Sequence, residues 1–83
     1  MQVQVRYFAS LRERLGPSET IELAEGSTLA QLRDVLIARD DAHAQALSRG
    51  RALRAALNQQ MADEWAVVPA GAEVAFFPPV TGG

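Results

Sequence analysis

Cysteine and lysine are both absent from this chain of 83 residues. Without cysteine it can form no disulfide scaffold, no cysteine-ligated zinc cluster and no thiol nucleophile, and a reducing compartment is permitted. All eight basic residues are arginines, so no lysine amine can accept an acyl group. The chain therefore has neither a thiol nor a lysine amine with which to form a covalent intermediate.

Positive charge and long apolar runs are also scarce. The net charge of -2 and the pI near 5.2 give no cationic field for a phosphate backbone, so we expect no nucleic-acid partner. The most apolar stretch, residues 65–80, contains prolines and a glycine and cannot form a spanning helix of about 20 residues, so no membrane segment is expected. Because Met1 leads directly into an alternating segment, no signal peptide is expected either, and the predicted location is the cytoplasm.

The length indicates one small domain with limited room for an enclosed active site. No nucleophile, base and pocket can be assembled from these residues, so we expect no enzymatic activity of the chain on its own. His43 has no second histidine or cysteine with which to bind a metal, and no metal site is expected. Its alanine-rich surroundings favour a surface helix. A binding or carrier module is the favoured class.

The apolar pattern predicts strands over residues 2–8, 19–24, 53–59 and 73–77. A short helix is predicted from Ser10, whose spacing to Glu13 fits a capping box, to a stop at Gly16. The main helix follows a cap at Ser27 or Thr28, and a weaker one starts at Asp40 or Asp41.

This order predicts an α+β roll, a ubiquitin-like β-grasp, with the first and last strands as parallel neighbours and the main helix on one face of the sheet. The domain is predicted to span residues 1–77, and residues 78–83 an extended tail. The predicted core consists of Val3, Val5, Ile21, Leu57, Val74 and Phe76.

The chain ends in six residues that fit neither a core nor a helix: Pro78, Pro79, Val80, Thr81, Gly82 and Gly83. Prolines and β-branched residues favour an extended path, and glycines pass where no Cβ fits. Extended, six residues reach about 20 Å. The arm can present only the carboxylate of Gly83, which is ionised at neutral pH and must be activated before it can react. Adenylation and attack by sulfur would leave a terminal thiocarboxylate.

Residues 73–83, EVAFFPPVTGG, preceded by Gly71, resemble the C-terminal signature of the molybdopterin synthase sulfur-carrier subunit. Similar residues of that family match Phe8-Ala9, Arg12-Glu13, Gly16 and Asn58-Gln59, so the resemblance spans nearly the whole chain. It implies that a partner related to ubiquitin-activating enzymes adenylates Gly83 with ATP, that a sulfur-donor protein completes the thiocarboxylate, and that the large synthase subunit receives the tail. No cofactor bound to this chain is implied.

The resemblance further implies that sulfur passes to cyclic pyranopterin monophosphate, to form the dithiolene of molybdopterin in a heterotetramer. It implies an apolar docking patch at Phe8, Met61 and Phe77. Alternation independently places Phe8 and Phe77 opposite the core face, where an exposed aromatic residue marks an interface. Packing of the two rings against each other is the alternative.

Two charged groups have competing interpretations. Arg49, Arg51 and Arg54 could contact an acidic partner, but a solvated turn and strand face is the commoner situation. Asp63-Glu64 resembles a carboxylate pair, yet adjacent residues on an exposed turn rarely converge on one substrate. We expect no catalytic role for them.

Three other functions fit a Gly-Gly terminus: a sulfur carrier for thiamine, cysteine or tRNA thiolation, a ubiquitin-like modifier of target lysines, and a non-catalytic β-grasp interaction module. The Phe-Phe-Pro-Pro segment before the tail favours the molybdopterin pathway.

Overall fold

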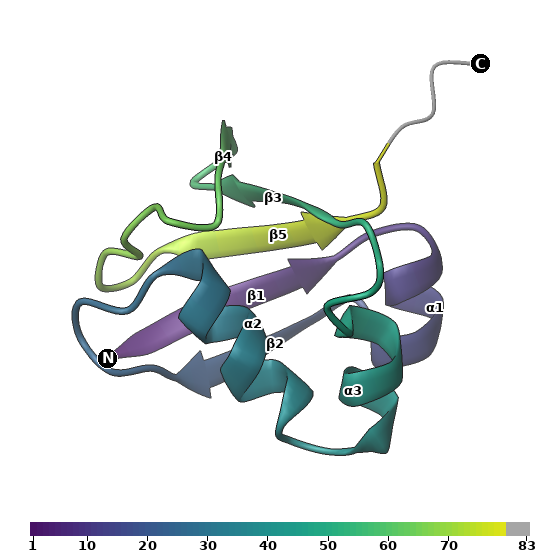
Figure 1. The fold of residues 1–83 in the computed structure, drawn as a ribbon. Helices are drawn as coiled ribbons and strands as arrows, with labels where there is room; N and C mark the ends of the chain where they lie inside the picture. Colours follow the sequence, from purple (N-terminus) through teal and green to yellow (C-terminus); the bar gives the residue numbers. More distant parts are fainter. Residues whose placement is uncertain (80–83) are drawn as a thin grey trace.

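A computed structural model describes residues 1–79 of the chain (Figure 1). Five strands and three helices follow one another as β1 (Gln2–Tyr7), α1 (Ser10–Leu15), β2 (Ser18–Glu22), α2 (Leu29–Ile37), α3 (Asp41–Leu47), β3 (Arg54–Leu57), β4 (Gln60–Ala62) and β5 (Glu73–Phe77). Within residues 1–79, no helix is long and apolar enough to cross a membrane.

The strands form one mixed sheet in the order β2-β1-β5-β3-β4. β1 and β5 are parallel neighbours, with Val5 opposite Val74 and Tyr7 opposite Phe76. The other three pairings are antiparallel. The parallel closure of the first and last strands and the N-terminal antiparallel pair are therefore confirmed. Helices α2 and α3 lie over one face of the sheet, as Figure 1 shows, and leave the other face without a helix.

Alternation along the strands produces the core. Val3, Val5 and Tyr7 of β1 are buried against the helices, while Gln4 and Arg6 point to the opposite face. Five of the six predicted core residues are buried, and Leu57 is half-buried against the same cluster. Leu29, Leu32 and Leu36 supply the apolar side of α2. Burying one face of the sheet under one helix stripe is what makes so small a domain stable.

The caps predicted for the first two helices have different outcomes. Thr28 caps α2 as predicted, because its Oγ1 accepts from the Gln31 amide while the Gln31 side chain accepts from the Thr28 amide. The Ser10 box is wrong. The residue before α1 is Ala9, with φ 53° and no side-chain cap, because the chain reverses sharply after Phe8 and Ser10 already lies within the helix.

After the helices, the sequence pattern predicts one strand over residues 53–59, but the structure has two shorter strands, β3 and β4. β3 ends at Leu57, and Asn58 and Gln59 both have positive φ, as in a two-residue hairpin turn. The strand predicted over residues 53–59 therefore ends two residues early, in a tight turn. This turn leads into β4, a three-residue strand that the sequence pattern does not predict.

His43 corrects a further prediction, because it is only 9% exposed and does not lie on a surface helix face. Its Nδ1 lies 2.7 Å from Asp40 Oδ1, and its Nε2 lies 2.7 Å from Glu19 Oε2. Glu19 also accepts from the Tyr7 hydroxyl at 2.8 Å. A polar group can be buried at little cost when both of its hydrogen-bonding atoms are satisfied, so this imidazole joins α3 to β2.

Candidate functional site

The face of the sheet opposite the helices is the candidate docking surface, called here the open face. Register places Met61 of β4 opposite Ala56 of β3, Ala56 opposite Ala75 of β5, and Ala75 opposite Arg6 of β1. Side chains of directly paired residues lie on the same side of a sheet, so these four form a row across it. Three of the four are apolar, which gives this part of the open face a continuous apolar strip.

The three residues predicted to bind a partner share the open face. Met61 is 60% exposed and Phe8 is 40% exposed, which is unusual for side chains of this size, and Phe77 is half-buried. The Phe8 amide donates to the Phe76 carbonyl at 3.2 Å, which extends the β1–β5 ladder by one residue and places Phe8 at the same end of the sheet as Phe77. The guanidinium of Arg6 lies 5.7 Å from the centre of the Phe8 ring, within cation–π distance.

The tail begins at the end of β5, between β1 and β3 in the middle of the sheet. Pro78 and Pro79 follow β5 directly and are half-buried. The predicted tail residues Val80, Thr81, Gly82 and Gly83 lie outside the described residues. A strand held on both sides by neighbours is a rigid base, so the start of the tail has a fixed position beside Phe77 and at the edge of the apolar strip.

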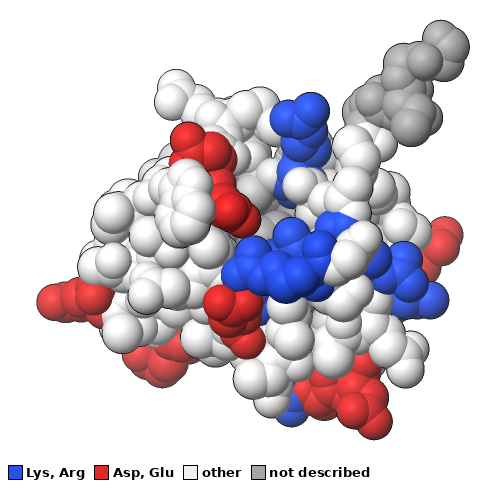
Figure 2. Space-filling model, in the orientation of Figure 1, with Lys and Arg blue, Asp and Glu red and all other residues white. Residues whose placement is uncertain are grey.

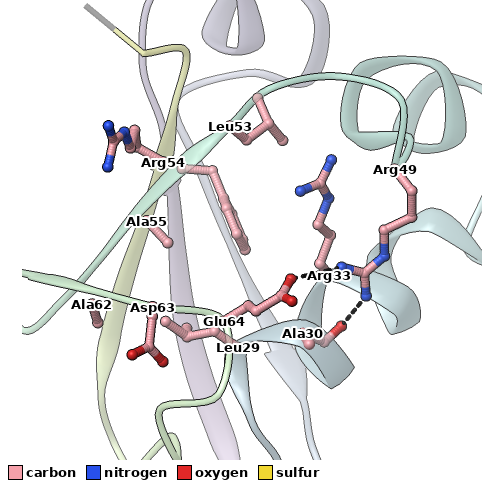
Figure 3. Close-up of a pocket in the computed structure, with 11 residues that line it drawn as sticks. Leu29, Ala30, Arg33, Arg49, Leu53, Arg54, Ala55, Ala62, Asp63 and Glu64 are labelled. Carbon is pink, nitrogen blue, oxygen red and sulfur yellow. Dashed lines mark hydrogen bonds and ion pairs between the residues drawn. The ribbon is translucent and has the colours of Figure 1, made fainter.

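A pocket of about 240 Å³ lies on the helical side, between α2, β3 and the loop after β4 (Figure 3). It is smaller than the roughly 300–1,000 Å³ of typical small-molecule sites. Two of the three arginines that line it are already bound: Arg33 donates to the carbonyls of Leu47, Ser48 and Arg51, and Arg49 to Asp34, Glu64 and the Ala30 carbonyl. The third is Arg54. Burial lowers the pKa of Arg33. The hydrogen bonds of Arg33 and Arg49 hold the segments around this pocket together, and we do not take it as the candidate site.

The remaining titratable groups do not form a catalytic site. The hydrogen-bonded group of Tyr7, Glu19, Asp40 and His43 lies on the helical side, away from the open face. Asp63 accepts from the Trp65 amide at 2.9 Å, and Glu64 pairs with Arg49. Within residues 1–79, no group of three histidine, aspartate or glutamate side chains is arranged so that it could hold a metal ion.

Figure 2 shows the charge of the helical side, where arginines form a central band between carboxylates. The sequence did not reveal that Arg33 and Arg49 are used inside the domain, because their acceptors are carbonyls and carboxylates of distant segments. It also did not single out Trp65, which is highly exposed after β4. Asp63 accepts a hydrogen bond from the Trp65 amide, and an aspartate two residues before the tryptophan is the local sequence signal that could have indicated an exposed turn there.

A model of the ThiS family matches residues 5–83. The chain is 42% identical over 81 residues to the molybdopterin synthase sulfur carrier subunit of Escherichia coli (strain K12), covering 98% of this chain and 99% of that protein. The predicted resemblance to this kind of subunit is therefore confirmed.

Two solved structures are similar to the whole fold. Small archaeal modifier protein 1 of Haloferax volcanii has a TM-score of 0.77 and 25% identity, covering 95% of this chain and 98% of that chain. The complex of subunits 1 and 2 of molybdopterin-converting factor from Helicobacter pylori 26695 contains a chain with a TM-score of 0.69 and 26% identity, covering 100% of both chains. The predicted ubiquitin-like β-grasp is confirmed by the sheet order and by these neighbours. The chain belongs to the ThiS family.

Proposed function

We propose that this chain is the sulfur-carrying small subunit of a molybdopterin synthase, and that Gly83 carries the sulfur. The observation that supports this best is the combination of a fixed tail base at Phe77 with an exposed apolar strip on the same open face. Such a surface can dock on a partner while the tail enters that partner's active site. The similarity to the E. coli sulfur carrier subunit over nearly the whole length supports the same function.

The proposed chemistry begins at the carboxylate of Gly83. One carboxylate oxygen attacks the α-phosphorus of ATP on an adenylating enzyme, which releases pyrophosphate and forms an acyl adenylate. Hydrosulfide supplied by the sulfur donor then attacks the acyl carbon, and AMP leaves with the electron pair of the broken carbon–oxygen bond. After loss of the sulfur-bound proton the chain ends in a thiocarboxylate, whose sulfur is a nucleophile.

Delivery follows in the complex with the large synthase subunit. The thiocarboxylate sulfur attacks a carbon of cyclic pyranopterin monophosphate and displaces an oxygen from it, and this oxygen leaves with the electron pair of the broken carbon–oxygen bond. Water then hydrolyses the bond between the acyl carbon and the sulfur. This returns the Gly83 carboxylate and leaves the sulfur on the product. Two charged carriers supply the two sulfurs of one dithiolene. The chain positions the reacting group, and the partner supplies the catalytic side chains.

Intact mass spectrometry tests the first half of this proposal. After incubation with the adenylating enzyme, ATP and sulfide, the chain should gain the mass of one oxygen-to-sulfur exchange at Gly83. Supplying the charged chain to the large subunit with cyclic pyranopterin monophosphate should then yield molybdopterin. Failure of the exchange with all components present would contradict the proposal.

A second candidate function is protein modification, which the similarity to a small archaeal modifier protein favours. A fold shared by a carrier and a modifier does not separate the two functions. In that case the Gly-Gly remnant of this chain would be found on lysines of other proteins after protease digestion. Its absence from cells in which molybdopterin forms would reject this alternative.

A further inference from the structure

Arg54 differs from the two other arginines that the sequence offers for partner contact. Arg49 donates to two carboxylates and a carbonyl, and Arg51 Nε donates to the Gln45 carbonyl at 2.7 Å. Both therefore act inside the domain. The exposed side chain of Arg54 makes no hydrogen bond or ion pair with any group in residues 1–79, which distinguishes it from the other two.

Arg54 also lies beside the start of the tail. It is the first residue of β3 and is paired with Phe77, the last residue of β5 before Pro78. Figure 3 shows its guanidinium directed away from the pocket, on the other side of β3 from Arg33 and Arg49. Neighbouring strands lie about 5 Å apart, so the backbone of Arg54 lies one strand spacing from the tail base.

The open face is electrically polarised along the strands. β1 and β5 run parallel, and the end where the tail begins carries Arg54, which is paired with Phe77, while Arg6 is paired with Ala75 in the middle of β5. The opposite end carries Glu22 and Glu73, on the same face by register with Gln2 and Gln4. Arg6 and Glu73 approach to 3.8 Å, so Arg6 is partly neutralised and Arg54 dominates the positive end.

Docking through the apolar strip removes water from this region. A cation that loses water without gaining a partner disfavours binding, so a complementary surface must offer an acceptor at this position. A guanidinium fits a carboxylate through two parallel hydrogen bonds. Arg54 stands without a second unpaired arginine close by in the sheet register, which suits one carboxylate rather than a phosphate with several negative charges.

We propose that Arg54 pairs with an aspartate or glutamate of the protein that receives the tail, next to the opening that the tail enters. The contact selects the orientation in which the positive end of the open face meets this acidic residue and the tail base meets the opening. This inference rests on the proposed function, because it takes the large synthase subunit as the receiving protein.

Binding kinetics of the full-length chain to the large subunit of the same synthase test this proposal. Arg54→Glu should weaken the affinity about tenfold, mainly through a slower association rate, and the effect should shrink as salt screens the charges. Arg54→Gln should give a smaller loss, and Arg54→Lys should retain most of the association rate. Arg51→Glu makes the same change of charge on the helical side and should leave the affinity within about twofold.

A charge swap then identifies the partner residue. Replacing the correct acidic residue of the large subunit by arginine should weaken binding to the unmodified chain and restore binding to Arg54→Glu, a coupling that a double-mutant cycle measures. Equal affinities of Arg54→Glu and the unmodified chain, equal losses for Arg54→Glu and Arg51→Glu, or the absence of any compensating swap would overturn the inference. If the unmodified chain itself does not bind the large subunit, the proposed function fails together with it. Melting temperatures of all variants establish that each is folded.

Discussion

Glu19 Oε2 of β2 lies 2.7 Å from Nε2 of His43 in α3, and this contact ties the second helix of the helical layer to the edge strand of the sheet. Burial by itself lowers the pKa of His43, but hydrogen bonds and charges of Glu19 and Asp40 outweigh it, so the pKa is raised. Burial likewise raises the pKa of Glu19, and its bonds to His43 and Tyr7 bring it below the ordinary value. The hydrogen bond from the His43 amide lowers the pKa of Asp40.

These shifts predict a stability that depends on pH. Because the folded state holds the His43 proton more tightly than the unfolded state, this stabilisation is complete below about pH 6.5 and is lost as the pH rises through the folded pKa. Glu19 and Asp40 contribute in the opposite sense, and their stabilisation is lost as the pH falls below about 4. The free energy of unfolding, measured in urea, should therefore be highest between about pH 4.5 and 6.5. His43→Gln should remove the decline above this range, and an unmodified chain that grows more stable from pH 6.5 to 8 would contradict the assignment.

The caps predicted at Ser10 and Thr28 provide a matched pair of substitutions. Thr28→Ala removes the hydroxyl that accepts from the Gln31 amide and should destabilise the protein by about 1 kcal/mol. Ser10→Ala removes the same type of group where no cap is formed and should change the free energy of unfolding by less than about 0.5 kcal/mol. Chemical denaturation of both variants measures the difference. Equal losses would show that Ser10 caps α1 in solution.

The sequence predicts most of the fold because the strongest signals are local. Alternation in β1 and β5 correctly assigns Val5 and Phe76 to the core, and Gln31 three residues after Thr28 correctly marks the start of α2. β4 escaped prediction because three residues are too few to show a period. His43 was misplaced because its acceptor Glu19 is 24 residues away in the chain, and a pattern within one helix cannot reveal such a partner.

The candidate site was also predicted only where its signals are local in the sequence. Alternation predicted that Phe8 and Phe77 lie opposite the core, and Phe8 is 40% exposed while Phe77 is half-buried. The docking role of Phe8, Met61 and Phe77 stays a prediction. The separation of Arg54 from Arg49 and Arg51 was not predicted, since it depends on which carbonyls and carboxylates the fold brings near each guanidinium. The role of Gly83 lies outside the described residues and stays a prediction.

The apolar strip predicts a selective effect on docking. Met61→Glu places a charge at the β4 end of the strip and should weaken binding to the large synthase subunit at least tenfold. Since Met61 is 60% exposed, the free energy of unfolding should change by less than about 0.5 kcal/mol. Val35→Glu introduces the same charge at a residue of α2 that is 44% exposed and should leave binding unchanged. Equal effects of the two substitutions on binding would show that the open face is not the docking surface.

The proposed sulfur chemistry depends on the position and identity of the terminal carboxylate. One alanine appended after Gly83 leaves residues 1–79 untouched but moves the carboxylate one residue further and adds a Cβ where the last two residues have none. The extended chain should gain no sulfur in the intact-mass assay and should support no molybdopterin formation, while its melting temperature stays that of the unmodified chain. Gly83→Ala keeps the length and adds only the methyl group, so it separates the effect of reach from that of side-chain bulk. If the chain with the appended alanine still gains sulfur at a normal rate, the carboxylate of Gly83 cannot be the group that carries it.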